Sequence, residues 1–554
     1  MTVKKKRSFF SGAVILMLSG VFVKGMGALF KIPLASAVGD EAMGYFSSAY
    51  SVYSMLFLIS TAGVPAALSR LIAAAEAEGD EGKTRRIFRV SFLLLAGVGL
   101  FFALALFFLA SPIARIPKEP ELEPLYRTLS PLLFFISVSA AFRGYFQGRQ
   151  NMIPTAVSQV IEASSNLAFG LSFGIRAQRA ALPPVLVAQK ILSGVVIGAA
   201  LSALFLSLVY AFKSRRRAAP SGSRRKIVKE LLAIALPVTL SAAILSLCGV
   251  IDSVVAVRRF KETVLDSSTV QNLLSSLAAA SAPAARSSGA VALYGAYASK
   301  AMTLFSLTPT LVTPIATSLL PAAGAAKAKG DAGKLAGTVS SALKGAFLLA
   351  LPASAGLFVL SGPVIRLLFP ADQILFYSAS GEAVTSHGVV PPMLSLLALA
   401  IPFAAFVSVA GAALQGTGQE KKSVVSGLLG VSAKLLAVLF LPAVPAVGVY
   451  ALPLSTLLCY LVMALMHHLF LRRSARVPVR FLPLLAGPFV SALACGAAAA
   501  ATFSLLPPKT PAPFSVFLSV FAGAAVYGIF LLLTGAVRLK KSSKKRRSPR
   551  AAGK

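Results

Sequence analysis

The sequence predicts an all-α integral membrane protein that crosses the bilayer about fourteen times. Of the 554 residues, 56% are hydrophobic and only 13% are charged, and the mean hydropathy is +0.80. A soluble chain of this length would be much less apolar. The apolar residues form runs near the length of about 20 residues that an α-helix needs to cross a hydrocarbon core about 30 Å thick.

These runs fall into two groups of six and a final pair. The first group lies near residues 9–37, 43–73, 87–113, 125–147, 152–175 and 183–212. The second lies near 231–256, 290–325, 336–361, 392–416, 423–441 and 446–470, and the pair near 481–506 and 513–537. We therefore expect an N-lobe (1–212), a basic linker (213–230), a C-lobe (231–472), two C-terminal helices (473–538) and a basic tail (539–554).

The distribution of basic residues predicts the orientation. About 35 of the 54 Lys and Arg residues fall in segments that alternate onto one side of the membrane, and about 11 fall on the other. The richer side, which includes both termini, is expected to be cytoplasmic. The net charge of +36 is thus explained by topology, and we expect no nucleic-acid partner.

A repeat relates the two groups of helices. The segment EGDEGK (Glu78–Lys83) recurs as KGDAGK (Lys329–Lys334), and SPIAR recurs as GPVIR at the same offset of about 251 residues. Each copy contains six spans, an even number, so both copies enter the membrane in the same sense. Parallel repeats of this kind form two lobes that hold substrate between them.

The first span contains two lysines. Its uncharged part is too short to cross the membrane, so the helix must continue past Lys24 toward Lys31. A lysine inside a span costs about 2.5–3.5 kcal/mol and needs a partner, a water-filled cavity or a function. The two lysines share one helix face, and Gly25, Gly27 and Pro33 can let this helix bend.

Other charged residues and prolines also lie within spans. Lys300 is a second candidate for lining a cavity, whereas Arg70 lies near a helix end, where its side chain can snorkel. Lys24 has the alternative of an ion pair with Asp252, and Arg143 is expected to pair with Glu162. Helix breaks or simple kinks are expected at three prolines, Pro65, Pro309 and Pro314.

The sequence contains no pattern typical of an enzyme. It has no Ser/His/Asp set, HExxH, P-loop or CxxC motif. We therefore expect no catalytic residue, no metal site and no cofactor. The three cysteines lie in apolar segments, so no disulfide framework is expected.

One segment, Gly20–Asp80, resembles the opening of the stage V sporulation protein B family. The shared features are K-x2-G-x3-K-I-P-L, then G-D-E-x-x-G-Y and A-G-V-P-A-A-L-S. This family belongs to the polysaccharide-exporter branch of the multidrug/oligosaccharidyl-lipid/polysaccharide (MOP) flippase superfamily, which also contains the lipid II flippases. The resemblance extends over the whole chain, as two six-helix lobes and two extra C-terminal helices.

This resemblance implies a transporter of the bacterial plasma membrane that serves peptidoglycan, capsule or spore-cortex synthesis. It would move undecaprenyl-diphosphate-linked sugars from the cytoplasmic to the outer leaflet by alternating access. Basic residues of the first, second and eighth helices would engage the diphosphate, here Lys24, Lys31, Arg70 and Lys300. The lipid-linked glycan and membrane lipids are the expected partners, and cell-wall synthesis proteins are further candidates.

Three alternatives remain from the sequence. A multidrug exporter of the same superfamily would bind organic cations, which favours an acidic cavity, whereas cations predominate here. A membrane glycosyltransferase would need acidic residues near an outer pocket. A non-enzymatic scaffold for cell-envelope synthesis would tolerate alanine at every intramembrane lysine.

Overall fold

The computed structural model describes residues 19, 22–23, 25–27, 29–61, 63–213, 223–263, 282–377, 382–444, 447–473, 481–507 and 509–536. In the N-lobe, residues 29–38 are helical. The helices that follow are α2 (Asp40–Thr61), α3 (Val64–Ala77), α4 (Glu81–Phe108), α5 (Ala110–Arg115), η1 (Pro120–Leu122), α6 (Glu123–Gly148), α7 (Ile153–Ser165), η2 (Asn166–Gly170), α8 (Leu171–Arg179) and α9 (Pro184–Lys213).

The second half of the chain is also helical, except for one short hairpin. Its first helices are α10 (Arg224–Val250), η3 (Ile251–Ala256), α11 (Val257–Thr263), α13 (Ala282–Ala296), η4 (Tyr297–Ala301), α14 (Met302–Ala328), α15 (Ala332–Val359) and α16 (Ser361–Leu368). After the hairpin come α17 (Ser386–Gly416), α18 (Glu420–Phe440), η5 (Leu441–Ala443), η6 (Gly448–Tyr450), α19 (Ala451–Arg473), α20 (Phe481–Leu505) and α21 (Ala512–Leu533).

The hairpin was not part of the all-α prediction. Strands β1 (Ile374–Tyr377) and β2 (Ala383–Thr385) pair antiparallel, with Phe376 opposite Val384. They lie in the connection between α16 and α17, outside the apolar runs. Alternating apolar residues over so few positions give too weak a sequence signal to predict a strand.

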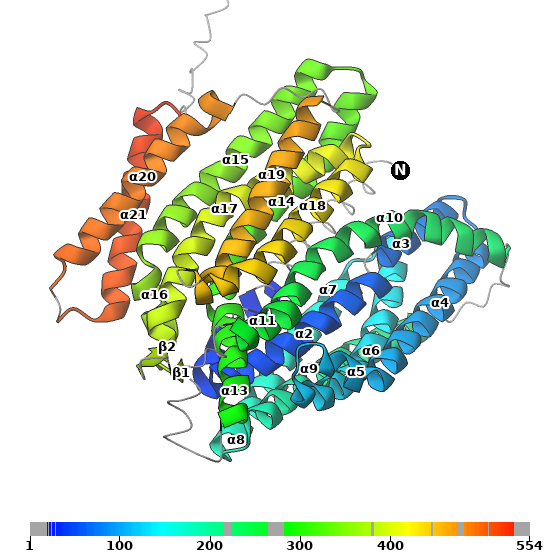
Figure 1. Ribbon diagram of the computed structural model, residues 1–554. Coiled ribbons are helices and arrows are strands. Elements are labelled where there is room, and N and C mark those ends of the chain that lie inside the picture. The colour runs from blue at the N-terminus through cyan, green and yellow to red at the C-terminus, as the bar shows by residue number, and fades with distance from the viewer. Residues whose placement is uncertain are drawn as a thin grey trace, which may run out of the picture.

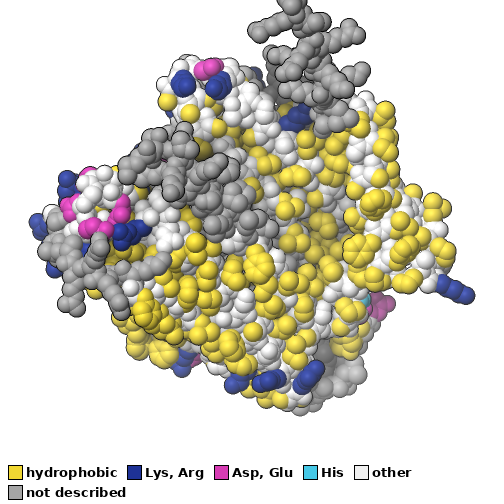
Figure 2. All heavy atoms as spheres, turned by 180° about the vertical axis from the view of Figure 1, so that it is seen from behind, with side chains coloured by type: hydrophobic (Ala, Val, Ile, Leu, Met, Phe, Trp, Pro, Cys, Tyr) yellow, Lys and Arg dark blue, Asp and Glu magenta, His cyan; other side chains and the backbone are white. Residues whose placement is uncertain are grey.

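The apolar runs correspond to helices that can span a membrane. Among the described residues, eleven helices are long and apolar enough to do so. Figure 2 shows hydrophobic side chains over most of the visible face, with basic and acidic side chains mainly toward its margins. The chain is therefore an all-α membrane protein apart from the hairpin, and the total of fourteen spans stays a prediction.

The repeated GDxGK motif begins corresponding helices in the two lobes. Asp80 accepts a hydrogen bond from the backbone N–H of Lys83 (2.7 Å), and Asp331 accepts one from Lys334 (2.8 Å). These aspartates are N-caps, which satisfy N–H groups that have no partner within the helix. Gly79 and the corresponding Gly330 have φ values of 73° and 69°, a left-handed conformation that favours glycine. The sequence repeat is thus also a structural one.

The two lobes converge at one end and diverge at the other (Figure 1). At the converging end, near α13 and the hairpin, α2 packs against α13 and η4. The diverging end carries the turns that precede α4 and α15. Helix α10 contacts α2 and α3 as well as α18, so it bridges the lobes. Helices α20 and α21 pack together on the outer side of α15.

Not all of the predicted helix breaks are present. In the second span, α2 ends at Thr61 and α3 begins at Val64, with Pro65 in its first turn, but residue 62 between them lies outside the described residues, so a break there stays a prediction. In contrast, α14 runs through Pro309 and Pro314 without interruption. The first helix is likewise unbroken at Pro33. A proline removes one N–H donor, which a helix packed in a bundle tolerates, so a break does not follow from proline alone.

Candidate functional site

A cavity of about 460 Å³ lies within the N-lobe. Its lining includes Lys31 from the first helix, Tyr50 from α2, Gln159 and Glu162 from α7, and Asn166 from η2. Lys31 is half-buried and forms no ion pair with any residue that the structure describes. A cation therefore lies on the wall of a partly polar cavity of a membrane protein.

The other cation at this cavity, Arg143, is neutralised. Its guanidinium donates hydrogen bonds to Glu162 (2.7 Å), Ser158 (3.0 Å) and Ser202 (3.1 Å). The Arg143–Glu162 ion pair thus joins α6 to α7 with the help of a hydroxyl from α9. Because Glu162 is occupied by this arginine, Lys31 supplies the unpaired positive charge among the described residues of the cavity.

Two other residues of the first helix can be placed, but Lys24 cannot. Gly25 and Gly27 are helical, and a Cβ added at either would meet open space. They therefore mark neither a break nor a close contact in this structure. Lys24 lies outside the described residues, so its role in the cavity stays a prediction.

Lys300 is buried at the junction of the lobes. Its ammonium donates hydrogen bonds to the Asp40 carboxylate (2.8 Å) and the Ser386 hydroxyl (3.1 Å), and both members of the ion pair are 1% exposed. Asp40 is the first residue of α2, where the helix dipole favours a negative charge. In this conformation Lys300 does not line an open cavity. Its ion pair with Asp40, which lies 260 residues earlier in the chain, instead holds the two lobes together.

Two further ion pairs cross the same end, one of them partly exposed and the other largely buried. Lys118, before α6, forms an ion pair with Glu262 of α11 (2.9 Å), and Lys261 pairs with Glu119. Hydrogen bonds from Lys118 and Arg258 lower the pKa of Glu262 to about 2. The converging end is therefore closed by charge pairs both inside and at the surface.

Close backbone contacts reinforce this closed end. A Cβ on Gly44 would lie 2.1 Å from the carbonyl oxygen of Val291, and one on Gly295 would lie 1.8 Å from that of Asp40. Only glycine permits α2 and α13 to approach so closely. These two glycines did not stand out in the sequence, because glycine is abundant throughout the chain.

We expect Gly295→Ala to force the lobes apart at this end, since the added methyl group would collide with backbone. In a cysteine-free protein, a cysteine at Val291, which is 1% exposed, should then react faster with a membrane-impermeant thiol reagent. Gly528→Ala is the matched control, because a Cβ there meets open space. Unchanged labelling in Gly295→Ala would show that this contact does not hold the end closed.

A third buried pair lies within the C-lobe. Lys434 of α18 donates hydrogen bonds to Asp252 (2.8 Å) and to Thr456 (2.7 Å), and Thr456 is 2.9 Å from the hydroxyl of Tyr297. Among the described residues, Lys434 is therefore the ion-pair partner of Asp252, whereas Lys24, the alternative partner expected from the sequence, lies outside them. Packing of α18 on η3 brings Lys434 and Asp252 together. The two residues are 182 positions apart in the chain, so the sequence alone did not indicate their pairing.

Each π-helical segment in the described part of the chain carries one of these polar residues. Asn166 lies in η2, Asp252 in η3 and Lys300 in η4. The π-helix is rare and is frequently found at functional sites. Asn166 lines the N-lobe cavity, and its buried Oδ1 has no hydrogen-bond partner among the residues that the structure describes. Arg70, the remaining predicted site residue, is exposed on α3 and has no ion pair among the described residues.

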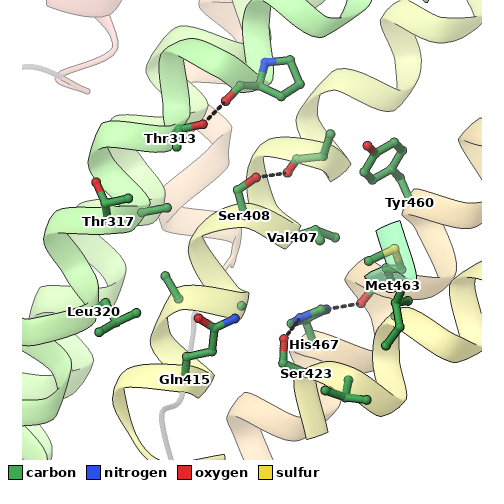
Figure 3. Close-up of a pocket in the computed structure, with 18 residues that line it drawn as sticks. Thr313, Thr317, Leu320, Val407, Ser408, Gln415, Ser423, Tyr460, Met463 and His467 are labelled. Atoms are coloured by element: carbon green, nitrogen blue, oxygen red, sulfur yellow. Dashed lines mark hydrogen bonds between the residues drawn. The ribbon is translucent and has the colours of Figure 1, made fainter. Parts of the chain in front are cut away.

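A separate pocket of about 340 Å³ lies within the C-lobe (Figure 3). It is formed by α10, α14, α17, α18 and α19. Its polar lining residues carry hydroxyl, amide and imidazole groups, and none of the described residues that line it is Lys, Arg, Asp or Glu. The two lobes thus enclose spaces of different chemistry, one with charged walls and one without.

Comparison with known proteins identifies the family. Residues 9–326 match the sequence profile of the polysaccharide biosynthesis protein family. The chain belongs to this family. It is also similar to two proteins of Bacillus subtilis (strain 168). Stage V sporulation protein B is 26% identical over 98% of each chain, and the lipid II flippase MurJ is 25% identical over 84% of this chain and 82% of that protein.

Solved structures of other proteins have the same fold as this chain. The lipid II flippase MurJ in an inward closed conformation has a TM-score of 0.65 at 14% identity, covering 94% of this chain and 98% of that one. An inward-facing MATE family multidrug transporter of the MOP superfamily has a TM-score of 0.64 at 17% identity, covering 84% and 98%. The chain is therefore a multi-pass bacterial membrane protein with the MOP fold, and these relatives are transporters rather than enzymes.

Proposed function

We propose that this protein is a flippase that carries an undecaprenyl-diphosphate-linked cell-wall precursor, lipid II or a related lipid-linked oligosaccharide, across the membrane. The observation that supports this most is Lys31, a cation without an acidic partner among the described residues, on the wall of the N-lobe cavity. The chain as a whole belongs to the polysaccharide biosynthesis protein family and is similar to a lipid II flippase.

The physical need for such a cation follows from the cargo. A diphosphate carries negative charge that cannot cross hydrocarbon unpaired, because removing an ion from water without compensation is prohibitively costly. A cavity with a cation on its wall offsets this cost while the prenyl chain stays in the lipid. Lysine can act here as a point charge for phosphate. Lys24 and Arg70 are further candidates, and Lys300 could join them once Asp40 has released it.

We infer transport from the cytoplasmic to the outer leaflet by alternating access. The lobes diverge at the end that carries the turns before α4 and α15, which the basic-residue asymmetry predicts to be cytoplasmic. The present conformation would then receive cargo from the cytoplasm. Opening of the other end requires the Asp40–Lys300 and Lys118–Glu262 pairs to separate.

The depletion of this protein in its own cells tests the proposed cargo. We expect one lipid-linked precursor to accumulate while its enzymes of synthesis remain active, and a membrane-impermeant enzyme added outside should fail to reach that precursor. Expression of the wild-type chain should restore access. An unchanged level and sidedness of every undecaprenyl-linked intermediate would contradict the proposed cargo.

The proposed orientation has its own test. Single cysteines in the linker at residues 213–230 should be labelled only after the membrane is permeabilised, because this segment is predicted to be cytoplasmic. A cysteine at Lys509, an exposed residue between α20 and α21, should be labelled in intact cells. Reversal of this pattern would place both termini outside and reverse the inferred direction.

Similarity to MATE transporters supports one alternative, an organic-cation exporter of the same fold. Such a site requires an available acidic group. The carboxylate at the N-lobe cavity belongs to Glu162, which Arg143 neutralises, and no described residue that lines the C-lobe pocket is acidic. The described cavities therefore favour an anionic cargo.

A further inference from the structure

We propose that the C-lobe pocket binds an uncharged, hydroxyl-rich sugar of the cargo headgroup, while the N-lobe cavity receives the diphosphate. This inference rests on the proposed flippase function and assigns a separate role to the second lobe. It begins from the difference in charge between the two spaces. An isolated diphosphate would be poorly held in the C-lobe pocket, whose lining includes no Lys or Arg from the described part of the chain.

The pocket is nevertheless rich in hydrogen-bonding groups. Thr313 and Thr317 project from α14, Ser408 and Gln415 from α17, and Ser423 from α18 (Figure 3). A pocket of about 340 Å³ with a few polar groups among apolar walls is typical of a small-ligand site. Its apolar part includes Leu320, Val407 and Met463, as the same view shows.

The hydroxyl groups are oriented by their own helices. Thr313 donates to the carbonyl of Pro309 (3.1 Å), Thr317 to that of Pro314 (3.0 Å) and Ser408 to that of Ala404 (3.0 Å). A hydroxyl has one donor and two acceptor positions. With the hydrogen used within the helix, the oxygen lone pairs remain to accept hydrogen bonds from a ligand. Sugar hydroxyls and N-acetyl N–H groups are donors of this kind.

Gln415 and the His467–Ser423 pair extend this surface. The Gln415 amide makes no hydrogen bond to a described residue, so it can both donate to and accept from a ligand. His467 lies with Nδ1 2.8 Å from the carbonyl of Met463 and Nε2 3.3 Å from the Ser423 hydroxyl. In a neutral ring, Nδ1–H donates to that carbonyl and Nε2 accepts from Ser423.

The pocket lies toward the diverging end of the lobes. It lies near the C-terminal ends of α14, α17 and α19 and the start of α18. Thr313 and Thr317 are exposed, because α14 leaves the N-lobe after η4. A sugar could therefore enter from the side that we propose to be cytoplasmic, while its diphosphate lies toward the N-lobe.

Binding of two purified lipids to the full-length protein in nanodiscs tests this assignment. One probe is lipid II, and the other is undecaprenyl diphosphate, which has the same chain and diphosphate but no sugar. We expect Thr317→Val and Gln415→Leu each to weaken binding of lipid II about three- to tenfold, the effect of one lost hydrogen bond, without changing the affinity for undecaprenyl diphosphate.

Matched controls are available in the same chain. Thr338→Val removes an exposed hydroxyl that also donates to its own helix (2.7 Å), and Gln178→Leu removes an exposed amide on α8. Neither should alter binding of either lipid.

Gly411→Ala, whose Cβ would lie 3.5 Å from Nε2 of His467, should partly fill the pocket and reproduce the loss for lipid II alone.

The outcomes separate this inference from the proposed function. Equal weakening for both lipids would mean that the pocket contacts the shared chain or diphosphate, and unchanged affinity for lipid II would mean that it does not contact sugar. Either result would overturn the sugar subsite but leave the flippase proposal intact. Failure of the wild-type protein to bind either lipid would instead contradict the proposed function, and the subsite with it.

Discussion

Lys300→Ala is expected to abolish transport and to reduce the stability of the folded protein. The substitution leaves the Asp40 carboxylate buried at the lobe junction without its ammonium partner. Removal of one member of a buried ion pair typically costs about 3–5 kcal/mol, because an uncompensated charge remains in a medium of low dielectric. Thermal unfolding in detergent and transport at equal membrane abundance would measure the two effects separately.

The double variant Asp40→Ala/Lys300→Ala separates a structural role from a substrate role. It should recover most of the lost stability, because no buried charge is left alone. If Lys300 also engages the diphosphate after the lobes part, transport should stay low. Recovery of both stability and transport would restrict Lys300 to a structural role.

The chain provides a matched control for this experiment in Asp252 and Lys434. This pair has the same 2.8 Å separation and is similarly buried, but both residues lie within one part of the C-lobe. Lys434→Ala alone should be destabilising, whereas Asp252→Ala/Lys434→Ala should recover both stability and transport. The contrast between the two double variants is therefore the informative result.

The second large effect is expected at Lys31. If its charge attracts the diphosphate, Lys31→Arg should keep partial transport and Lys31→Ala should lose much of it. Lys31→Glu should lose nearly all, because a carboxylate at the cavity wall repels the anion rather than merely failing to attract it. Transport would be compared at equal membrane abundance, since misfolding would produce the same loss.

Lys509→Glu is the control for this series, because it makes the same change of charge at an exposed residue outside the cavity. It should transport normally. The order arginine, alanine, glutamate is specific to an electrostatic role, because a packing role would favour the residue closest in volume whatever its charge. Normal transport by Lys31→Glu would remove Lys31 from the substrate site.

The features that the sequence predicted well are local or repeated. The GDxGK motif indicated the same helix start in both lobes, because Asp80 and Asp331 each accept a hydrogen bond from a backbone N–H only three residues later. Arg143 and Glu162, on consecutive helices, were close enough in the chain for their pairing to be predicted.

The features that it did not predict depend on contacts distant in the chain. Nothing near Lys300 or Asp40 in sequence identifies them as partners, and the same holds for Lys434 and Asp252. The close approach of α2 to α13 requires Gly44 and Gly295, but only the packed lobes distinguish them from other glycines. The polar groups of the C-lobe pocket come mainly from serine, threonine and glutamine, which form no motif until α14, α17 and α18 come together.

The most direct test of the central claim is translocation by the purified protein. Vesicles would contain lipid II in both leaflets, and a membrane-impermeant reagent outside would modify only accessible headgroups. With the wild-type protein, modification should continue until nearly all of the lipid has reacted, whereas with Lys31→Glu it should stop at the outer leaflet. If the wild-type protein also left the inner-leaflet lipid unmodified, as protein-free vesicles do, the account of a cationic flippase cavity would be contradicted.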